Sequence, residues 1–201
     1  MESRNKCALI VFVKNPDRGY VKTRLAQTIG HQQALEVYLD LLRHTQKTTV
    51  EVAAHVHVYY SRCIETNDIW AEPHYTKHRQ MGTHLGQRMH HAFSEMFDAG
   101  YKKAVIIGSD CFELTTSHIT DAFEVLDRRQ AVIGPAADGG YYLLGMRRHS
   151  PSLFKNKNWG SASVFSDTIR DMQKESLSWA ELPVLNDIDT GADWEQYKQC
   201  R

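Results

Sequence analysis

Basic side chains gather in one short segment near the start of the chain, where they suit the binding of phosphate. Residues 14–24 hold four cations, which are Lys14, Arg18, Lys22 and Arg24. Lysine supplies a point charge and arginine a forked pair of hydrogen-bond donors, and both suit a polyphosphate. A solvated basic turn is the alternative interpretation. The segment is not a P-loop, because Val21 stands where that motif needs a glycine.

A carboxylate in the middle of the chain, Asp110, suits a divalent cation. It follows a buried apolar run that ends at Ile107. Mg²⁺ keeps several of its waters and uses one or two protein carboxylates together with substrate phosphates, so a full cage of ligands is unnecessary. The alternative is that Asp110 caps the following helix, although Glu113 lies nearer to the start of that helix.

Two later segments add further carboxylates. Asp138 precedes Gly139 and Gly140, which let the backbone approach a ligand closely, but this triplet is equally typical of a hairpin turn. Asp187 and Asp189 are two residues apart and project to the same side of an extended segment, so one of them is expected to complete the metal site. In the alternative, Asp189 or Thr190 caps a terminal helix.

These charged segments follow strands in a pattern that alternates strand and helix. Apolar runs and alternations predict strands at residues 7–13, 54–60, 104–107, 131–133, 141–144 and 182–185. Apolar residues at helical spacing predict helices that include residues 35–42, 85–97, 119–126 and 165–172, and hydroxyls at 115–117 supply a cap for the third. The order predicts a mostly parallel, layered α/β sheet, whose ligands bind beyond the carboxyl ends of its strands.

Size and composition limit the class of protein. The 201 residues fit a single domain, which we expect to span 1–201. No segment resembles a signal peptide or is apolar for long enough to cross a bilayer, so we expect a soluble cytoplasmic protein with no membrane partner. Lys plus Arg and Asp plus Glu each number 24, which gives no global basic field for nucleic acid. The oligomeric state stays open. We expect reduced thiols at Cys7, Cys63, Cys111 and Cys200.

Five ordered motifs, which together span nearly the whole chain, resemble one bacterial family. They are Lys14-x-Pro16 with Gly19-x-Val-Lys-Thr-Arg-Leu25, Gln80-x-Gly-x-x-Leu-Gly-x-Arg-Met89, Gly108-Ser-Asp-Cys111, Gly134-Pro-Ala-x-Asp-Gly-Gly-Tyr-Tyr142 and Asp187-Ile-Asp-Thr190. In them the chain is similar to the nucleotide-diphospho-sugar transferase proteins of the radical-SAM-associated type. Those proteins are related to molybdopterin-guanine-dinucleotide-synthase and phospholactate-guanylyltransferase enzymes.

The resemblance implies a three-layer α/β/α fold of the GT-A type and a glycosyl- or nucleotidyltransferase. It implies a divalent metal, Mg²⁺ or Mn²⁺, a nucleotide or nucleotide-sugar donor, and a small-molecule acceptor of unknown identity. By resemblance Lys14, Lys22 and Arg24 bind the donor phosphates and Asp110 binds the metal. We expect Asp189 or Asp187 to assist at the metal.

The expected mechanism is mainly electrostatic. Lys22 acts with the other cations of the opening segment to neutralise the charge of the leaving group. Asp138 is the expected base on the acceptor side.

The chain departs from the family pattern at four positions. Aspartate is common where this chain has His84 and Ala137, and proline is usual where it has Phe112 and Gly191. The two missing carboxylates motivate a rival hypothesis, a catalytically weak or inactive nucleotide-binding regulatory domain. A second rival, a HAD-type phosphatase, rests on the spacing of Asp187 and Asp189. Only a short tail follows them, whereas the phosphatase nucleophile follows an early strand.

Several other residues receive no catalytic role. His55 and His57 share one strand face without a third ligand, so we expect a solvated or hydrogen-bonded pair rather than a metal site. His84 lies in a family motif and is expected at the cleft. Large aromatic residues are expected to pack in the core or in a lid, and these are Trp159, Trp179 and Trp194.

Overall fold

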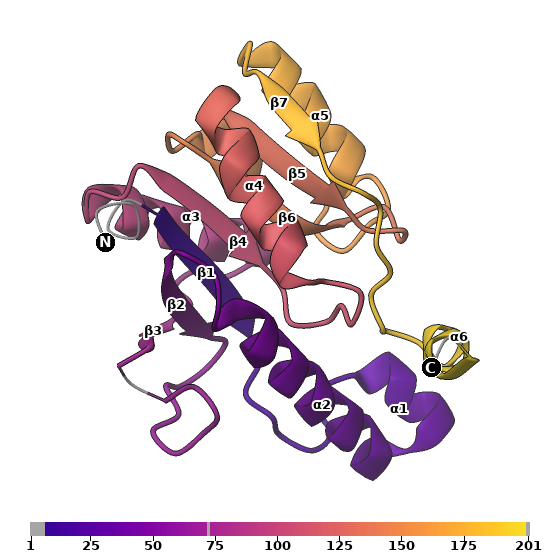
Figure 1. The fold of residues 1–201 in the computed structure, drawn as a ribbon. Helices are drawn as coiled ribbons and strands as arrows, with labels where there is room; N and C mark the ends of the chain where they lie inside the picture. Colours follow the sequence, from indigo (N-terminus) through magenta and orange to yellow (C-terminus); the bar gives the residue numbers. More distant parts are fainter. Residues whose placement is uncertain (1–6, 72, 200–201) are drawn as a thin grey trace.

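The computed structural model describes residues 7–71 and 73–199, which build a seven-stranded sheet (Figure 1). The strand order is β3-β2-β1-β4-β6-β5-β7. The bounds are β1 Cys7–Val13, β2 His55–Tyr60, β3 Tyr75–Arg79, β4 Lys103–Ile107, β5 Ala131–Pro135, β6 Tyr141–Met146 and β7 Trp179–Glu181. Within the described sheet β6 alone runs against its neighbours β4 and β5, and the other pairs are parallel. The predicted mostly parallel mixed sheet is confirmed.

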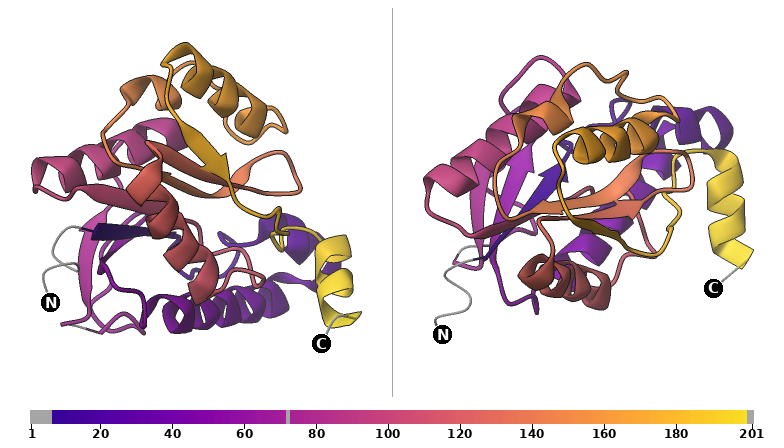
Figure 2. Two further views of the ribbon diagram at one scale, coloured as in Figure 1. Left: turned by 45° about the horizontal axis from the view of Figure 1, so that its top comes forward. Right: turned by 90° about the horizontal axis from the view of Figure 1, so that it is seen from above.

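Helices cover both faces of this sheet, as Figure 2 shows, and give the predicted three layers. Their bounds are α1 Thr23–Ile29, α2 His31–Thr49, α3 Leu85–Asp98, α4 Thr116–Arg128, α5 Val164–Lys174 and α6 Gly191–Gln199, with a 3₁₀ turn at Pro151–Phe154. Helices α2 and α4 pack on one face, where Leu9 and Val11 of β1 point. Helices α3 and α5 pack on the other, where Ala8 and Ile10 point. The continuous apolar run of β1 is therefore buried on both faces.

A smaller cluster lies at the carboxyl edge of the sheet, where α1 and α6 lie side by side (Figure 1). Leu25 of α1, Leu41 of α2 and Ile188 form part of its buried core. Gly191, which replaces the usual proline, begins α6 against α1, and a Cβ there would lie 2.6 Å from Thr28 Oγ1. The close approach of the two helices explains why a residue without a side chain stands at this position.

Two strand predictions were incomplete or wrong. The last strand was expected at residues 182–185, but the edge strand is β7, and Leu185 makes only an isolated bridge to Ala136. Pro183 has no N–H for a ladder, which ends regular pairing there. Strand β3 was missed because it is polar and partly exposed at the sheet edge, so it shows no apolar pattern.

Three further expectations concern the histidine pair of β2, the cysteines and membrane-spanning segments. His55 and His57 both hydrogen-bond the hydroxyl of Tyr101, at 2.9 and 3.0 Å, as a hydrogen-bonded pair should. Cys7, Cys63 and Cys111 are free thiols, and Cys200 lies outside the described residues. Among the described helices, none combines the length and apolar character needed to cross a bilayer.

Candidate functional site

The charged segments predicted from the sequence meet at one cavity of about 470 Å³. Lys14 follows β1, Asp110 follows β4, Asp138 follows β5 and Asp187 follows β7, and all of them line this cavity. These four strands are parallel to one another, so their carboxyl ends lie along the same edge of the sheet. The structure therefore brings the predicted residues together, while their chemical roles stay predictions.

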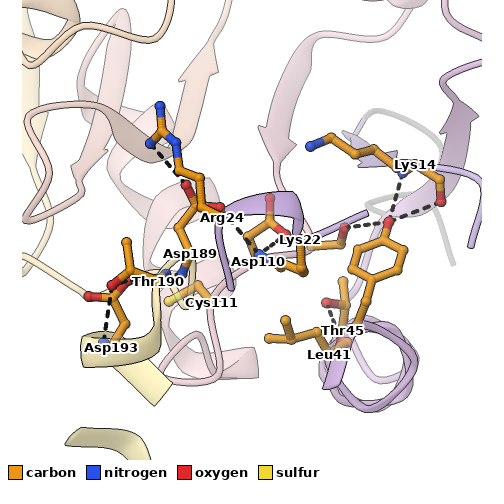
Figure 3. A network of polar contacts seen from close by, with 12 residues as sticks. Lys14, Lys22, Arg24, Leu41, Thr45, Asp110, Cys111, Asp189, Thr190 and Asp193 are labelled. Atoms are coloured by element: carbon orange, nitrogen blue, oxygen red, sulfur yellow. Dashed lines mark hydrogen bonds and ion pairs between the residues drawn. The ribbon is translucent and has the colours of Figure 1, made fainter. Parts of the chain in front are cut away.

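Lys22 is buried and forms an ion pair with Asp110 beside this cavity (Figure 3). Its Nζ lies 2.5 Å from Asp110 Oδ1 and 4.0 Å from Asp189 Oδ1, and its side chain is 3% exposed. Lys22 immediately precedes α1 with φ 47°, in the left-handed region that side chains rarely adopt. Such a conformation costs on the order of 1–3 kcal/mol and persists only where the surroundings determine it. The turn thus holds the ammonium group at the carboxylates.

Arg24 pairs with the other predicted metal ligand, Asp189 (Figure 3). Arg24 Nη1 lies 3.2 Å from Asp189 Oδ2, and both side chains are largely exposed. An exposed pair of this kind contributes at most about 1 kcal/mol. The sequence analysis assigned cations and carboxylates to separate ligands, whereas here they are each other's counterions.

Tyr38 of α2 links two segments of the site, and sequence analysis treated it only as part of an apolar stripe. The backbone N–H of Lys14 donates to its oxygen at 2.7 Å, and its hydroxyl donates to the carbonyl of Lys14 at 3.0 Å. Ser109 Oγ lies 3.4 Å from the same oxygen. Burial raises the pKa of Tyr38 far above its usual value, so the hydroxyl stays neutral. It therefore acts as a fixed brace between the loops after β1 and β4.

The segment that carries Asp187 and Asp189 is tied to the loop after β4. Glu113 accepts hydrogen bonds from the backbone N–H of Asn186 at 2.7 Å and from its side-chain amide. The N–H of Ile188 donates to the carbonyl of Asp110 at 2.9 Å. The carboxylates of both segments are therefore held at one place by backbone contacts.

Hydroxyl groups, rather than the candidate carboxylates, cap the two neighbouring helices. Thr115 Oγ1 accepts from the N–H of His118 at the start of α4. Thr190 Oγ1 accepts from the N–H of Asp193, and Asp193 accepts from the N–H of Thr190 at 2.7 Å, in a reciprocal cap of α6. The capping interpretation of Asp110 is thus excluded, and that of Asp189 gives way to Thr190.

Asp187 lies in a concentration of negative charge. Its pKa is raised to about 7, first by burial and then by the nearby Asp110, with smaller contributions from Asp138 and Asp189, while Lys22 opposes the rise. A divalent cation would relieve this repulsion, so the residues present fit such an ion. Within the described residues no group of three or more His, Cys, Asp or Glu side chains could hold a metal alone. Mg²⁺ does not require one when phosphates complete its coordination.

We predict that the metal-free protein loses stability as the pH rises toward 8 and that Asp187→Asn removes this loss. The pKa of Asp187 is higher in the folded protein than in the unfolded chain, so folding favours the protonated carboxyl group. The resulting stabilisation is fully present below about pH 4 and is lost as the pH rises to about 7. Melting temperatures of both proteins with a chelator, at pH 5.5 and 8, test this. The melting temperature of the variant, relative to that of the wild type, should be higher at pH 8 than at pH 5.5. An equal difference at both pH values would contradict the prediction.

The Asp138 turn is held by a segment that we call the strap, residues 158–163. Asp138 Oδ1 accepts from the N–H of Gly140 at 2.8 Å, so the turn interpretation holds although the residue also lines the cavity. Gly139 has φ 89°, and a Cβ on it would lie 2.2 Å from the carbonyl oxygen of Ala162. The strap thus packs directly on backbone that only glycine can offer.

The other end of the strap packs on α3. Trp159 lines the cavity, as expected of an aromatic residue in a lid, and its indole lies against Gly86, where a Cβ would be 2.4 Å from Nε1. This buried Nε1 has no hydrogen-bond partner among the described residues. The strap therefore packs against two glycines of the sequence motifs, Gly86 and Gly139, where a side chain would clash with it.

Both positions that lack the family aspartate lie outside the cavity. His84, expected at the cleft, instead caps α3, where its Nδ1 accepts from the N–H of Gln87. Aspartate is also a common residue at such a cap. Ala137 is exposed and does not line the cavity either.

Comparison with known proteins agrees with this fold. Residues 41–161 match a family model described as an uncharacterised protein conserved in bacteria. A crystal structure from Desulfovibrio desulfuricans G20, described provisionally as a nucleotide-diphospho-sugar transferase, is 32% identical with a TM-score of 0.90. The match covers 97% of this chain and 87% of that one. No curated protein matches the sequence.

More distant structures share the fold alone. A CMP:2-keto-3-deoxy-manno-octonic acid synthetase complexed with CTP is 11% identical with a TM-score of 0.61, covering 97% of this chain and 98% of its own. Rv0371c of Mycobacterium tuberculosis H37Rv, in complex with manganese, is 10% identical with a TM-score of 0.54, covering 98% and 100%.

Proposed function

This chain belongs to the DUF2064 family of bacterial proteins, and we propose that it is a metal-dependent transferase with a nucleotide or nucleotide-sugar donor. The observation that carries the proposal is the cavity at the carboxyl ends of the strands, where Lys14, Asp110 and Asp187 lie together and Lys22 reaches Asp110. The transferase description of the 32% identical relative and the CTP bound to a distant one support it.

The residues fit distinct tasks in such a reaction. Asp110, with Asp187 or Asp189, would hold Mg²⁺ or Mn²⁺, which supplies positive charge that stabilises the phosphate oxygens as the donor bond breaks. Lys22, Lys14 and Arg24 bind the donor phosphates and neutralise the charge that develops on the leaving group. Asp138, on the cavity-lining turn after β5, takes the proton of the acceptor hydroxyl.

The alternative is a catalytically weak or inactive nucleotide-binding regulatory domain. It rested on the missing aspartates at His84 and Ala137, which lie outside the cavity. We further propose that the chain works as one domain in the cytoplasm on a small-molecule acceptor, without a membrane or nucleic-acid partner.

A thermal-shift panel of nucleoside triphosphates and nucleotide-sugars, each with Mg²⁺, Mn²⁺ or chelator, tests the proposal. A ligand at a hundredfold excess over its Kd stabilises the folded state by about 2.7 kcal/mol. We expect at least one donor to raise the melting temperature with metal and to lose this effect with chelator. If no nucleotide stabilises the protein with either metal, the proposed function is wrong.

A further inference from the structure

Two of the three carboxylates proposed for a metal, Asp110 and Asp189, already pair with cations of the chain. Lys22 Nζ lies 2.5 Å from Asp110 Oδ1, and Arg24 Nη1 lies 3.2 Å from Asp189 Oδ2. Lys22 immediately precedes α1, and Arg24 lies in the first turn of that helix. A free metal ion that binds Asp110 must therefore displace the ammonium group of Lys22 or bind next to its positive charge, and either is unfavourable.

The two ion pairs differ in how readily they open. Arg24 is exposed, so water can solvate its guanidinium when it leaves Asp189. Lys22 is buried, and an ammonium group without a counterion is costly there. The second carboxylate in range of Lys22 is Asp189, whose Oδ1 lies at 4.0 Å and whose Oδ2 is paired with Arg24. We therefore expect Lys22 to release Asp110 when another anion takes the place of that carboxylate.

A polyphosphate supplies that anion and carries the metal with it. Its oxygens can accept the ammonium group of Lys22 while the bound cation meets the freed carboxylate of Asp110. The exchange replaces one ion pair by two and leaves no buried charge without a partner. Asp187, which repels Asp110, then gains a cation as well.

We propose that Lys22 acts as a gate, so that the cavity accepts a divalent cation only as its complex with a polyphosphate. The inference rests on the proposed function and names the form in which the donor binds: the metal chelate. Because coupling between two ligands is reciprocal, the metal must strengthen polyphosphate binding by the same factor as the polyphosphate strengthens metal binding.

The test measures binding of free Mn²⁺ by electron paramagnetic resonance in wild type and in Lys22→Met. The variant should bind free Mn²⁺ at least about tenfold more tightly than the wild type, because it leaves Asp110 without its cation; such a factor is a common size of coupling. Wild-type protein titrated with Mn²⁺-pyrophosphate should bind the complex more tightly than free Mn²⁺. Equal affinity of both proteins for free Mn²⁺ would overturn the gate.

Lys103→Met is the matched control. Lys103 pairs with Asp127 at 2.6 Å at the amino end of β4, the same strand whose carboxyl end precedes Asp110. Its removal should leave the affinity for free Mn²⁺ unchanged, and a gain as large as that of Lys22→Met would overturn the assignment to Lys22. If Lys22→Met does not fold, Arg24→Gln replaces it, because Arg24 is exposed. This variant frees Asp189 and should bind free Mn²⁺ more tightly than the wild type, although by a smaller factor. An unchanged affinity for free Mn²⁺ would count against the gate.

The outcomes separate this inference from the proposed function. If Lys22→Met gains affinity for free Mn²⁺ but no nucleotide binds the wild type, the gate stands and the transferase proposal fails. If nucleotides bind with metal while free Mn²⁺ binds wild type and variant alike, the function stands and the gate fails.

Discussion

Replacing Asp110 by asparagine is expected to slow turnover by about a hundredfold or more. Asp110 is the carboxylate that the cavity presents directly after β4, and loss of a charge that stabilises a transition state is worth several kcal/mol. Asparagine keeps an oxygen that can accept a hydrogen bond from Lys22. Alanine would remove the nearer counterion of this buried ammonium group and leave it only Asp189 at 4.0 Å, so we expect a greater loss of stability than with asparagine.

The measurement uses the donor that the thermal-shift panel identifies. Asp110→Asn should lose both turnover and the metal-dependent rise in melting temperature. Asp138→Asn is the comparison, because Asp138 lines the same cavity on the turn after β5. It should keep the metal-dependent shift yet lose rate by roughly a hundredfold, as expected for a general base. Full activity of Asp110→Asn would remove it from the metal site, and an undiminished rate in Asp138→Asn would remove that residue as the base.

The apolar patterns of the chain predicted the layers because burial determines them. β1 is buried on both faces and therefore reads as a continuous apolar run. Strand β3 is a polar edge strand, so nothing in its sequence separates it from a loop. The same reasoning explains the misplaced last strand, where Leu182 and Leu185 are apolar but only isolated backbone contacts reach β5.

The location of the site was predictable from topology, whereas its internal contacts were not. Charged residues directly after parallel strands must meet at one edge, which placed Lys14, Asp110 and Asp138 correctly. The pairing of Lys22 with Asp110 depends on a left-handed turn at a lysine, which no residue preference signals. Tyr38 was missed because its position in an apolar helical stripe predicts only core packing. Its ring does pack in the core, but its hydroxyl also hydrogen-bonds Lys14.

The sequence indicated that the glycines of the motifs allow a close approach, but only the structure shows which segment approaches them. Sequence analysis assigned Gly139 to close approach of a ligand, but the backbone of the strap approaches it instead. Gly86 likewise leaves room for Trp159. Gly139 places the strap against the turn that carries Asp138, and Gly86 places it against α3, so the packing of the strap determines the shape of this part of the cavity wall.

Gly139→Ala is therefore expected to destabilise the protein by about 3 kcal/mol and to displace the strap. Alanine at φ 89° is strained, and its Cβ would meet the carbonyl oxygen of Ala162 at 2.2 Å, so backbone has to move. The two costs are each on the order of 1–3 kcal/mol. Urea denaturation gives the stability. Native tryptophan fluorescence contains the signal of Trp159 in the strap together with those of Trp70, Trp179 and Trp194, so it is measured as a difference from the wild type.

Gly100→Ala separates the strain from the clash. Gly100 follows α3 with φ 91°, nearly the same conformation, but a Cβ there would meet nothing within 4 Å. It should cost only about 1 kcal/mol and leave the native fluorescence unchanged. If both variants lose the same stability, backbone conformation alone explains Gly139. The strap would then not be positioned by Gly139, and the turn that carries Asp138 would be held by its hydrogen bonds, among them that from the N–H of Phe165 to the carbonyl of Gly139.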